Sequence, residues 1–254
     1  MGTRAADARG RGDGSLPAKI ATRWGTRAAE LYTEAYALRY RAHDDAIARA
    51  QVVAGFGKWL RGVCERFHGP IDVLDLGCGT GRYFHALERV QRLVGIDVSR
   101  AMLDKANRPV GEVAIPSGSL TLVEADFLVH EFEAGRFDLV YSIGVLAEHS
   151  PLDEAVAARV FRWLKPGGRF AFTTVHPFSF SVPRTFKRRA GEWLLPVAFG
   201  ALRQPLRRRL MSDGLYADEE HVRDVLAATG FAVESIEPFE SDVHLHLLTV
   251  AFKH

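Results

Sequence analysis

The sequence predicts an α/β fold in which short buried strands alternate with helices around one core. The first observation is that short apolar runs recur between stretches whose apolar residues repeat with helical spacing. The second is a glycine-rich turn directly after the first of these runs, within residues 71–87. The third is size, because 254 residues with 47% hydrophobic and 25% charged side chains suit one generous domain better than two.

Residues 71–87 combine a strand and a tight turn with the start of a helical pattern. The helix is predicted over 82–89. The apolar run 71–76 has the composition of a strand buried on both faces. Asp75 lies near its carboxyl end, and the glycines that follow let the backbone take positive φ and approach a ligand closely. The turn residues expected at the ligand are Gly77, Cys78, Gly79 and Gly81. We therefore expect a small polar ligand on this turn.

The details of the turn argue against two common phosphate-binding motifs. Arg82 stands where the GxGxxG fingerprint of NAD sites has its last glycine, and no GK[ST] follows as a P-loop requires. The expected ligand therefore has no pyrophosphate. A second contact is expected at Asp97 and its neighbour Val98, where the predicted strand 92–97 ends about 20 positions after the turn. The two carboxylate oxygens of Asp97 suit the paired hydroxyls of a ribose.

Five ordered motifs resemble those of the class I S-adenosylmethionine-dependent methyltransferases. They are DLGCGTG at 75–81, GIDVS at 95–99, AD at 125–126, FDLVYS at 137–142 and LKPGGRF at 164–170. The resemblance covers roughly residues 70–175, and its order and spacing are more specific than any single motif. It implies a doubly wound, mostly parallel seven-stranded sheet, the Rossmann-like methyltransferase fold, with an antiparallel last strand. It also implies S-adenosyl-L-methionine as the cofactor.

The resemblance assigns further cofactor contacts. Asp126 would bond the exocyclic amine of adenine, and the backbone N–H of Phe127 would face the ring. The loop after the fourth strand would flank the cofactor with Ser142, Ile143 and Gly144, since ligands bind outside the carboxyl ends of parallel strands. This loop lacks the NPPY or DPPY sequence of family members that methylate nucleobase or amide nitrogens, which argues against such an acceptor.

Two histidines follow predicted strands and are candidate general bases. His176 is the first choice and His149 the second. In each case the alternative is a histidine whose only role is to form hydrogen bonds within its loop. His244 and His246 point to one side of the last predicted strand, but no third ligand has suitable spacing, so no metal site is expected.

The N-terminal part divides into a tail and a helical segment. Residues 1–19 lack apolar periodicity and are expected to be disordered, whereas residues 20–68 predict two or three helices that resemble a lid over the cofactor. Tyr32, Tyr36 and Tyr40 are four residues apart and would share one face, with Tyr40 as a cofactor contact. Simple packing of an aromatic stripe remains the alternative.

The methyltransferase core is expected over 69–254, with an insert at 178–212 before the sixth strand. Its segment 184–209 contains eight basic residues and one acidic residue, a local charge of +7. Such an insert, rich in aromatic and basic residues, would suit a hydrophobic acceptor bearing an acidic group. A solvated helix face is the alternative for the basic residues.

The leading hypothesis is methyl transfer from S-adenosylmethionine to oxygen or nitrogen of a small, lipophilic or anionic metabolite. One alternative is an RNA (tRNA) methyltransferase that uses the basic insert, although nucleic acid is not the favoured acceptor; the other is a non-catalytic S-adenosylmethionine-binding protein. An NAD oxidoreductase ranks below these. Two cysteines and the absence of a long apolar stretch favour a cytoplasmic protein without a membrane span. A monomer or homodimer is expected.

Overall fold

The computed structural model describes residues 22–47, 51–110, 119–177, 216–241 and 244–254, and the single positions 116, 179, 190, 193, 194, 197 and 206. The helices are α1 Arg23–Leu31, α2 Glu34–Ile47, α3 Gln51–Cys64, α4 Arg100–Ala106, α5 Glu154–Trp163 and α8 Glu219–Ala228, with the 3-10 helix η1 Phe84–Ala86. The strands are β1 Ile71–Leu76, β2 Val90–Asp97, β3 Leu120–Glu124, β4 Phe137–Ser142, β5 Leu164–Val175, β6 Phe231–Glu240 and β7 Leu245–Lys253.

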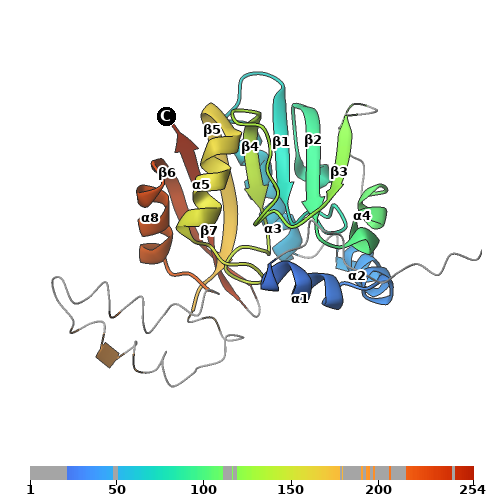
Figure 1. Ribbon diagram of the computed structural model, residues 1–254, viewed down its shortest axis with the longest axis horizontal. Coiled ribbons are helices and arrows are strands. Elements are labelled where there is room, and N and C mark those ends of the chain that lie inside the picture. Colours follow the sequence, from blue (N-terminus) through green and yellow to red (C-terminus); the bar gives the residue numbers. More distant parts are fainter. Residues whose placement is uncertain are drawn as a thin grey trace, which may run out of the picture.

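The seven strands form one sheet in the order β3-β2-β1-β4-β5-β7-β6 (Figure 1). The first five strands pair in parallel, whereas β7 runs antiparallel to both β5 and β6. Strand order reverses at β1, which has β2 on one side and β4 on the other. The predicted fold class is confirmed, and its switch point lies at the carboxyl ends of β1 and β4.

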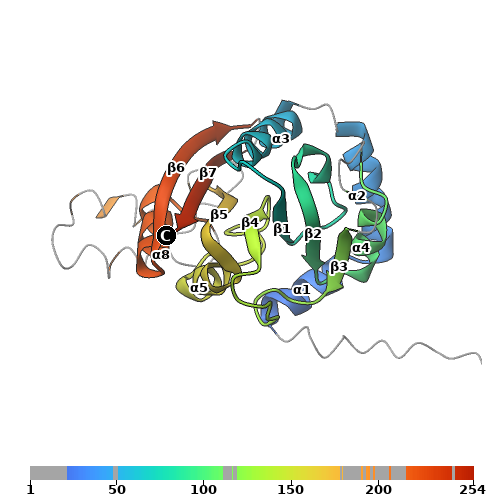
Figure 2. The same cartoon turned by 90° about the horizontal axis from the view of Figure 1, so that it is seen from above.

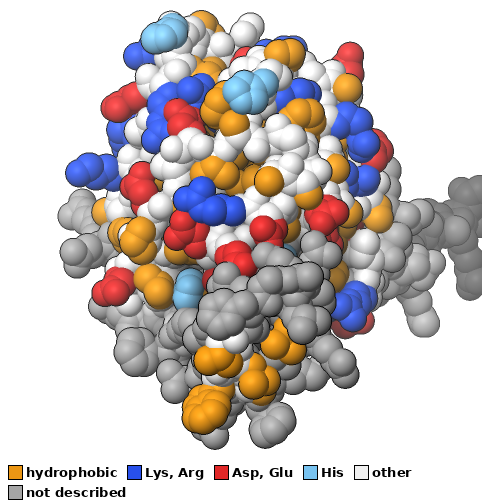
Figure 3. Space-filling view, turned by 90° about the vertical axis from the view of Figure 1, so that its left-hand side faces the viewer, with side chains coloured by type: hydrophobic (Ala, Val, Ile, Leu, Met, Phe, Trp, Pro, Cys, Tyr) orange, Lys and Arg blue, Asp and Glu red, His pale blue; other side chains and the backbone are white. Residues whose placement is uncertain are grey.

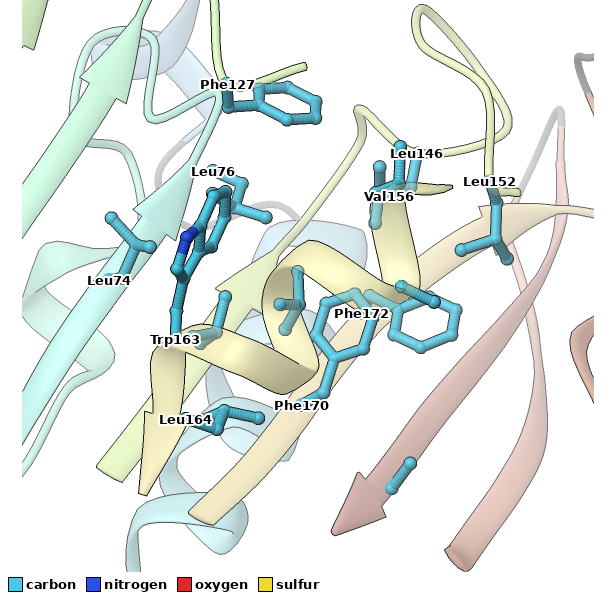
Figure 4. Close-up of a cluster of buried hydrophobic side chains, with 14 of the residues drawn as sticks. Leu74, Leu76, Phe127, Leu146, Leu152, Val156, Trp163, Leu164, Phe170 and Phe172 are labelled. Atoms are coloured by element: carbon cyan, nitrogen blue, oxygen red, sulfur yellow. The ribbon is translucent and has the colours of Figure 1, made fainter. Parts of the chain in front are cut away.

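Each face of the sheet is covered by helices and has its own apolar cluster (Figure 2). On one face α5 and α8 pack on the strands, and Trp163 of α5 lies beside Leu74 and Leu76 of β1 (Figure 4). On the other face α3, η1 and α4 pack, with Leu60 and Phe84 fully buried. Burying each of these side chains contributes about 1.5–3 kcal/mol, so both faces hold the sheet rigid.

Side-chain caps begin the helices that follow the strands. Ser99 accepts a hydrogen bond from the Met102 N–H at the start of α4, and Asp153 accepts one from Val156 at the start of α5. Ser99 Oγ also donates to the carbonyl of Tyr32, at 2.6 Å. The cap of α4 therefore ties the N-terminal helices to the edge of the sheet where β2 ends.

The helix expected over 82–89 is not formed; only η1 is helical, and this part of the expectation is wrong. Its hydrogen bonds span three residues, from Phe84 N–H to the Gly81 carbonyl at 3.1 Å and onward. A Cβ on Gly81 would lie 2.8 Å from the Phe84 ring, so this ring packs directly on the glycine turn. Arg82 is held by an ion pair to Asp44 of α2. These tertiary contacts outweigh the helical pattern of the sequence.

Other boundaries also differ from expectation. β2 begins at Val90, not at residue 92. The sequence predicts a strand over 169–175, but β5 already begins at Leu164, because Leu164 pairs with Phe137 before the register shifts. Gly167, with φ of 76°, lies within this irregular stretch. Tyr32 ends α1 as its C-cap, so the three tyrosines come from two helices, not one.

The described residues include little of the predicted insert. The tail 1–19 and nearly all of 178–212, including most of the basic segment 184–209, lie outside them. Figure 3 shows the side of the molecule formed by β6 and α8, where basic and acidic side chains are interspersed on the described surface. Within the described ranges, no helix combines the length and apolar character needed to cross a bilayer.

Candidate functional site

A cavity of about 530 Å³ opens along the carboxyl edge of the parallel strands. Helix α1 crosses this edge below β1, β2 and β3 (Figure 1). The cavity is lined by the ends of β1, β2 and β3, by the loop after β4, and by the N-terminal helices. It extends as far as the end of β6 and the start of β7. Its volume is in the range of small-molecule sites.

Most of the predicted site residues meet in this cavity. Those that line it are Tyr40, Asp75, Gly77, Cys78, Asp97, Val98, Asp126, Phe127, Ile143, Gly144 and His149. Four others do not: Gly79, Gly81, Ser142 and His176. The hydroxyl of Ser142 is buried and donates to the Leu76 carbonyl at 2.9 Å, so it fixes β4 to the end of β1.

The glycine turn is built by backbone hydrogen bonds and close packing. The N–H groups of Gly77 and Cys78 donate to the Ile96 carbonyl at 2.8 and 3.1 Å. Gly77 has φ of 71°, and a Cβ there would lie 2.7 Å from the side chain of Val145. Glycine is therefore required at this position for two reasons: the backbone has a positive φ, and Val145 leaves no room for a Cβ.

Asp97 connects the turn to β2. Its carboxylate accepts from Gly79 N–H at 3.0 Å and from Ser99 N–H at 2.9 Å. Burial raises the pKa of this carboxyl to about 6, although the backbone donors oppose the shift. Asp97 is thus held in a fixed orientation at the cavity wall.

Asp75 is buried at the end of β1, and burial raises the pKa of its carboxyl to about 8, with the nearby carboxylate of Asp97 adding to the shift. Asp75 is therefore protonated at neutral pH, and can donate as well as accept a hydrogen bond.

Asp126 follows β3 and contacts the start of α1. Thr22, the N-cap of α1, donates its hydroxyl to one carboxylate oxygen, and Leu128 N–H donates to the other at 2.9 Å. A Cβ on Gly25 would collide with the Asp126 carboxylate. Helix α1 therefore packs directly over the residue expected to face adenine.

The tyrosines from α1 and α2 form a contiguous aromatic wall. Tyr32 and Tyr36 meet edge to face at 5.1 Å, and Tyr36 stacks on Tyr40 at 5.7 Å. The Arg82 guanidinium lies over the Tyr40 ring, 4.8 Å from its centroid. The predicted shared face is present despite the break between the helices.

A buried ion pair that the sequence did not reveal joins α2 to the glycine turn. Asp44 is 1% exposed and accepts from Arg82, with Nε to carboxylate at 2.7 Å, and from the hydroxyl of Thr80. Residues 44 and 82 are far apart in the chain, and an aspartate on a helix gives no sign of such a partner. The pair fixes α2 to the turn.

The two candidate bases lie in different surroundings. His149 lines the cavity; its ring lies 6.3 Å from that of Tyr32, and its Nε2 is 3.8 Å from the Glu148 carboxylate. His176 follows β5, where its backbone N–H donates to the Leu245 carbonyl at 2.8 Å. Burial lowers the pKa of the His176 imidazole. Within the described residues, no group of histidine, cysteine and acidic side chains suits a metal ion, and this holds for His244 and His246.

The polar end of the cavity fits the adenosyl group. Carboxylates accept hydrogen bonds from hydroxyl and amine groups, and two of them, Asp97 and Asp126, face the cavity about one strand spacing apart, at the ends of β2 and β3. Met102 and Phe127, which also line the cavity, supply apolar surface for a flat base.

Comparison with known proteins agrees with this arrangement. A family described as a methyltransferase domain matches residues 73–168. The sterol 24-C-methyltransferase of Kluyveromyces lactis is 34% identical over 101 residues, which are 39% of this chain and 27% of that protein. The demethylmenaquinone methyltransferase of Lactococcus lactis is 35% identical over 112 residues, 42% of this chain and 43% of that protein. The chain thus spans less than half the length of either relative.

Solved structures share the fold over most of the chain. An S-adenosylmethionine-dependent methyltransferase from Mesorhizobium loti has a TM-score of 0.56 at 22% identity, covering 79% of this chain and all of that one. Magnesium protoporphyrin IX methyltransferase from Synechocystis, with bound S-adenosylmethionine, has a TM-score of 0.61 at 16% identity. The match covers 92% of this chain and 99% of that one. Residues 73–168 therefore match a methyltransferase domain, and the solved methyltransferase structures share the fold over most of the chain.

Proposed function

We propose that this chain transfers the methyl group of S-adenosylmethionine to an oxygen or nitrogen atom of a small, lipophilic acceptor. One observation carries the proposal: a single cavity extends from Asp97 and Asp126 to an apolar wall formed by Phe56 and Phe239. A cofactor held at the polar end would therefore adjoin an acceptor held at the apolar end.

The cofactor, when bound, supplies a methyl group already activated on a sulfonium. The chain's own residues then have to hold donor and acceptor in line and exclude water, which can account for about 7–11 kcal/mol of a barrier. Helices α1 and α2 support this role, because Thr22 and Asp44 fix them to Asp126 and to the glycine turn.

The charges that line the cavity favour a neutral over an anionic acceptor. Asp97, Asp126 and Glu148 are acidic, whereas Arg82 is already paired with Asp44. The basic residues expected to hold an acidic group lie mostly outside the described part of the chain. The named acceptors of two similar proteins, a sterol and demethylmenaquinone, support the lipophilic class.

We propose His149 before His176 as the group that accepts a proton from a hydroxyl or amine acceptor. His149 lines the cavity and His176 does not. A positioned base contributes about 10²–10⁴-fold to a proton transfer, and contributes nothing where the acceptor is a carboxylate.

The test is product formation from S-adenosylmethionine carrying a labelled methyl group, with a panel of neutral lipophilic alcohols, phenols and amines. We expect a labelled product from at least one class, and His149→Gln should lower kcat at least tenfold, while the matched His176→Gln variant changes it little. Tight cofactor binding without any labelled product would instead favour the non-catalytic alternative.

A cytoplasmic location and a monomeric or homodimeric state are further proposals. The loop 143–151, without NPPY or DPPY, supports a small molecule over nucleic acid as acceptor. Light scattering of the purified chain would decide between monomer and dimer.

A further inference from the structure

The apolar end of the cavity is an aromatic box built around Phe56 of α3. Its ring lies 5.0 Å from that of Phe239, 6.3 Å from that of Tyr83 and 5.1 Å from that of His246. All four line the cavity. The box is close-packed, because a Cβ on Gly55 would lie 2.5 Å from the Phe239 ring. A further flat ring would gain from burial against these faces and from the same offset or edge-to-face contacts.

His246 is the polar member of this box. It is 6% exposed, and its Nδ1 is enclosed without a hydrogen-bond partner among the described residues. Burial lowers the pKa of this imidazole to about 4, so the ring is neutral at physiological pH. A neutral imidazole has one donor and one acceptor, and a half-turn of the ring exchanges nitrogen and carbon positions. A buried polar group left without a partner is unfavourable. Because Nδ1 has almost no accessible surface in this orientation, it meets a ligand in the cavity after that half-turn, which carries it to the opposite edge of the ring.

The position of His246 separates it from the cofactor contacts. It pairs with Val175 of β5 and Phe239 of β6, so it lies on β7, three strand spacings from β1. That separation is roughly 14 Å across the sheet. His246 is therefore at the end of the cavity remote from Asp75 and Asp97.

We propose that His246 binds a hydroxyl or carbonyl group at the far end of the acceptor, and that the acceptor is a neutral molecule with a flat, fused-ring body lying against Phe56 and Phe239. This inference rests on the proposed function, since it assigns the acceptor's place in the same cavity. The distance from β1 requires more than one ring. The acidic residue Glu240 at the same wall, and the neutral His246, make an acceptor with a carboxylate at this end unfavourable.

The test uses the full chain and three probes of one shape: naphthalene, 2-naphthol and 2-naphthoate. Binding of S-adenosylhomocysteine is measured first, and probe dissociation constants are then measured with that compound at saturation. We expect 2-naphthol to bind roughly fivefold or more tightly than either other probe, the size of one buried hydrogen bond. His246→Phe should abolish this preference, His246→Gln should restore part of it, and the control variant His176→Gln, at a histidine that does not line the cavity, should keep it.

The outcomes separate the two proposals. If S-adenosylhomocysteine does not bind, the proposed function is wrong, and the probe preference measured without it still decides on His246. Equal binding of naphthalene and 2-naphthol by the unaltered chain, or an undiminished preference in His246→Phe, would overturn the inference. Since phenylalanine could disturb the fold, the circular dichroism and S-adenosylhomocysteine affinity of each variant are compared with those of the unaltered chain. Should His246→Phe not fold, loss of the preference in His246→Leu supports the inference and its retention overturns it.

Discussion

The two ends of the cavity are constructed differently. At the polar end, Asp97 is held by the N–H groups of Gly79 and Ser99, which lie 18 and 2 residues away in the sequence. At the apolar end, Phe56 meets Phe239 and His246. Phe56 comes from the N-terminal part of the chain and the other two from its C-terminal part. The comparison teaches that the cofactor end is specified by a local backbone pattern, whereas the acceptor end is specified by long-range packing. Variation at the second end can change the acceptor without altering the first.

The largest effect is expected at the glycine turn. Gly77→Ala introduces both a strained positive φ and a contact of 2.7 Å with Val145. We expect a loss of about 2–5 kcal/mol in stability, with cofactor affinity reduced. The control is Gly135→Ala, because Gly135 has a similar φ of 64° and nothing within 4 Å of its Cβ position. Denaturant unfolding measures both, and equal losses would show that packing against Val145 is unimportant.

Next in size is the ion pair that joins α2 to the glycine turn. Asp44→Asn leaves the largely buried Arg82 guanidinium without its carboxylate, and we expect about 2–4 kcal/mol of destabilisation together with weaker cofactor binding. The neighbouring Asp45, whose pair with Arg41 is exposed, provides the matched variant Asp45→Asn, expected to change stability by less than about 0.5 kcal/mol. Similar unfolding curves for the two variants would contradict this account.

A smaller effect concerns Asp75. Its carboxyl has a pKa of about 8 in the folded chain, raised by burial. A carboxyl whose pKa is raised on folding stabilises the fold fully below its ordinary pKa, and this contribution is lost progressively as pH rises from there to about 8. The melting temperature of Asp75→Asn, which resembles the protonated form, should therefore depend less on pH than that of the unaltered chain between about pH 4 and 8. Parallel pH profiles of the melting temperature would refute the assignment.

The smallest effect is the pH dependence of cofactor binding. Burial raises the pKa of Asp97 to about 6, so below that pH the carboxyl is protonated and loses its ability to accept two ribose hydrogen bonds. We expect S-adenosylhomocysteine affinity to fall by up to about tenfold per pH unit below 6, and to stay level above it. Calorimetry between pH 5 and 8 gives this profile, and a flat one would count against Asp97 as the ribose contact.

The sequence predicted the polar end because its signals are local. The bounds of β1 and β4 matched expectation, since apolar runs end at glycine or polar residues. It failed for residues 82–89, where Phe84 packs on Gly81 and Arg82 pairs with Asp44, contacts that no local pattern encodes. For the same reason Phe56 and Phe239 were missed, and His246 was considered only as a metal ligand.

The central claim is that Asp97 and the glycine turn bind an adenosyl compound. The most direct test is calorimetric titration of S-adenosylhomocysteine into the unaltered chain and into Asp97→Ala at pH 7.5. We expect binding to the unaltered chain and an affinity at least about 100-fold lower for the variant, since two charge-assisted hydrogen bonds are lost. No binding to the unaltered chain, or equal affinity for both proteins, would contradict the claim.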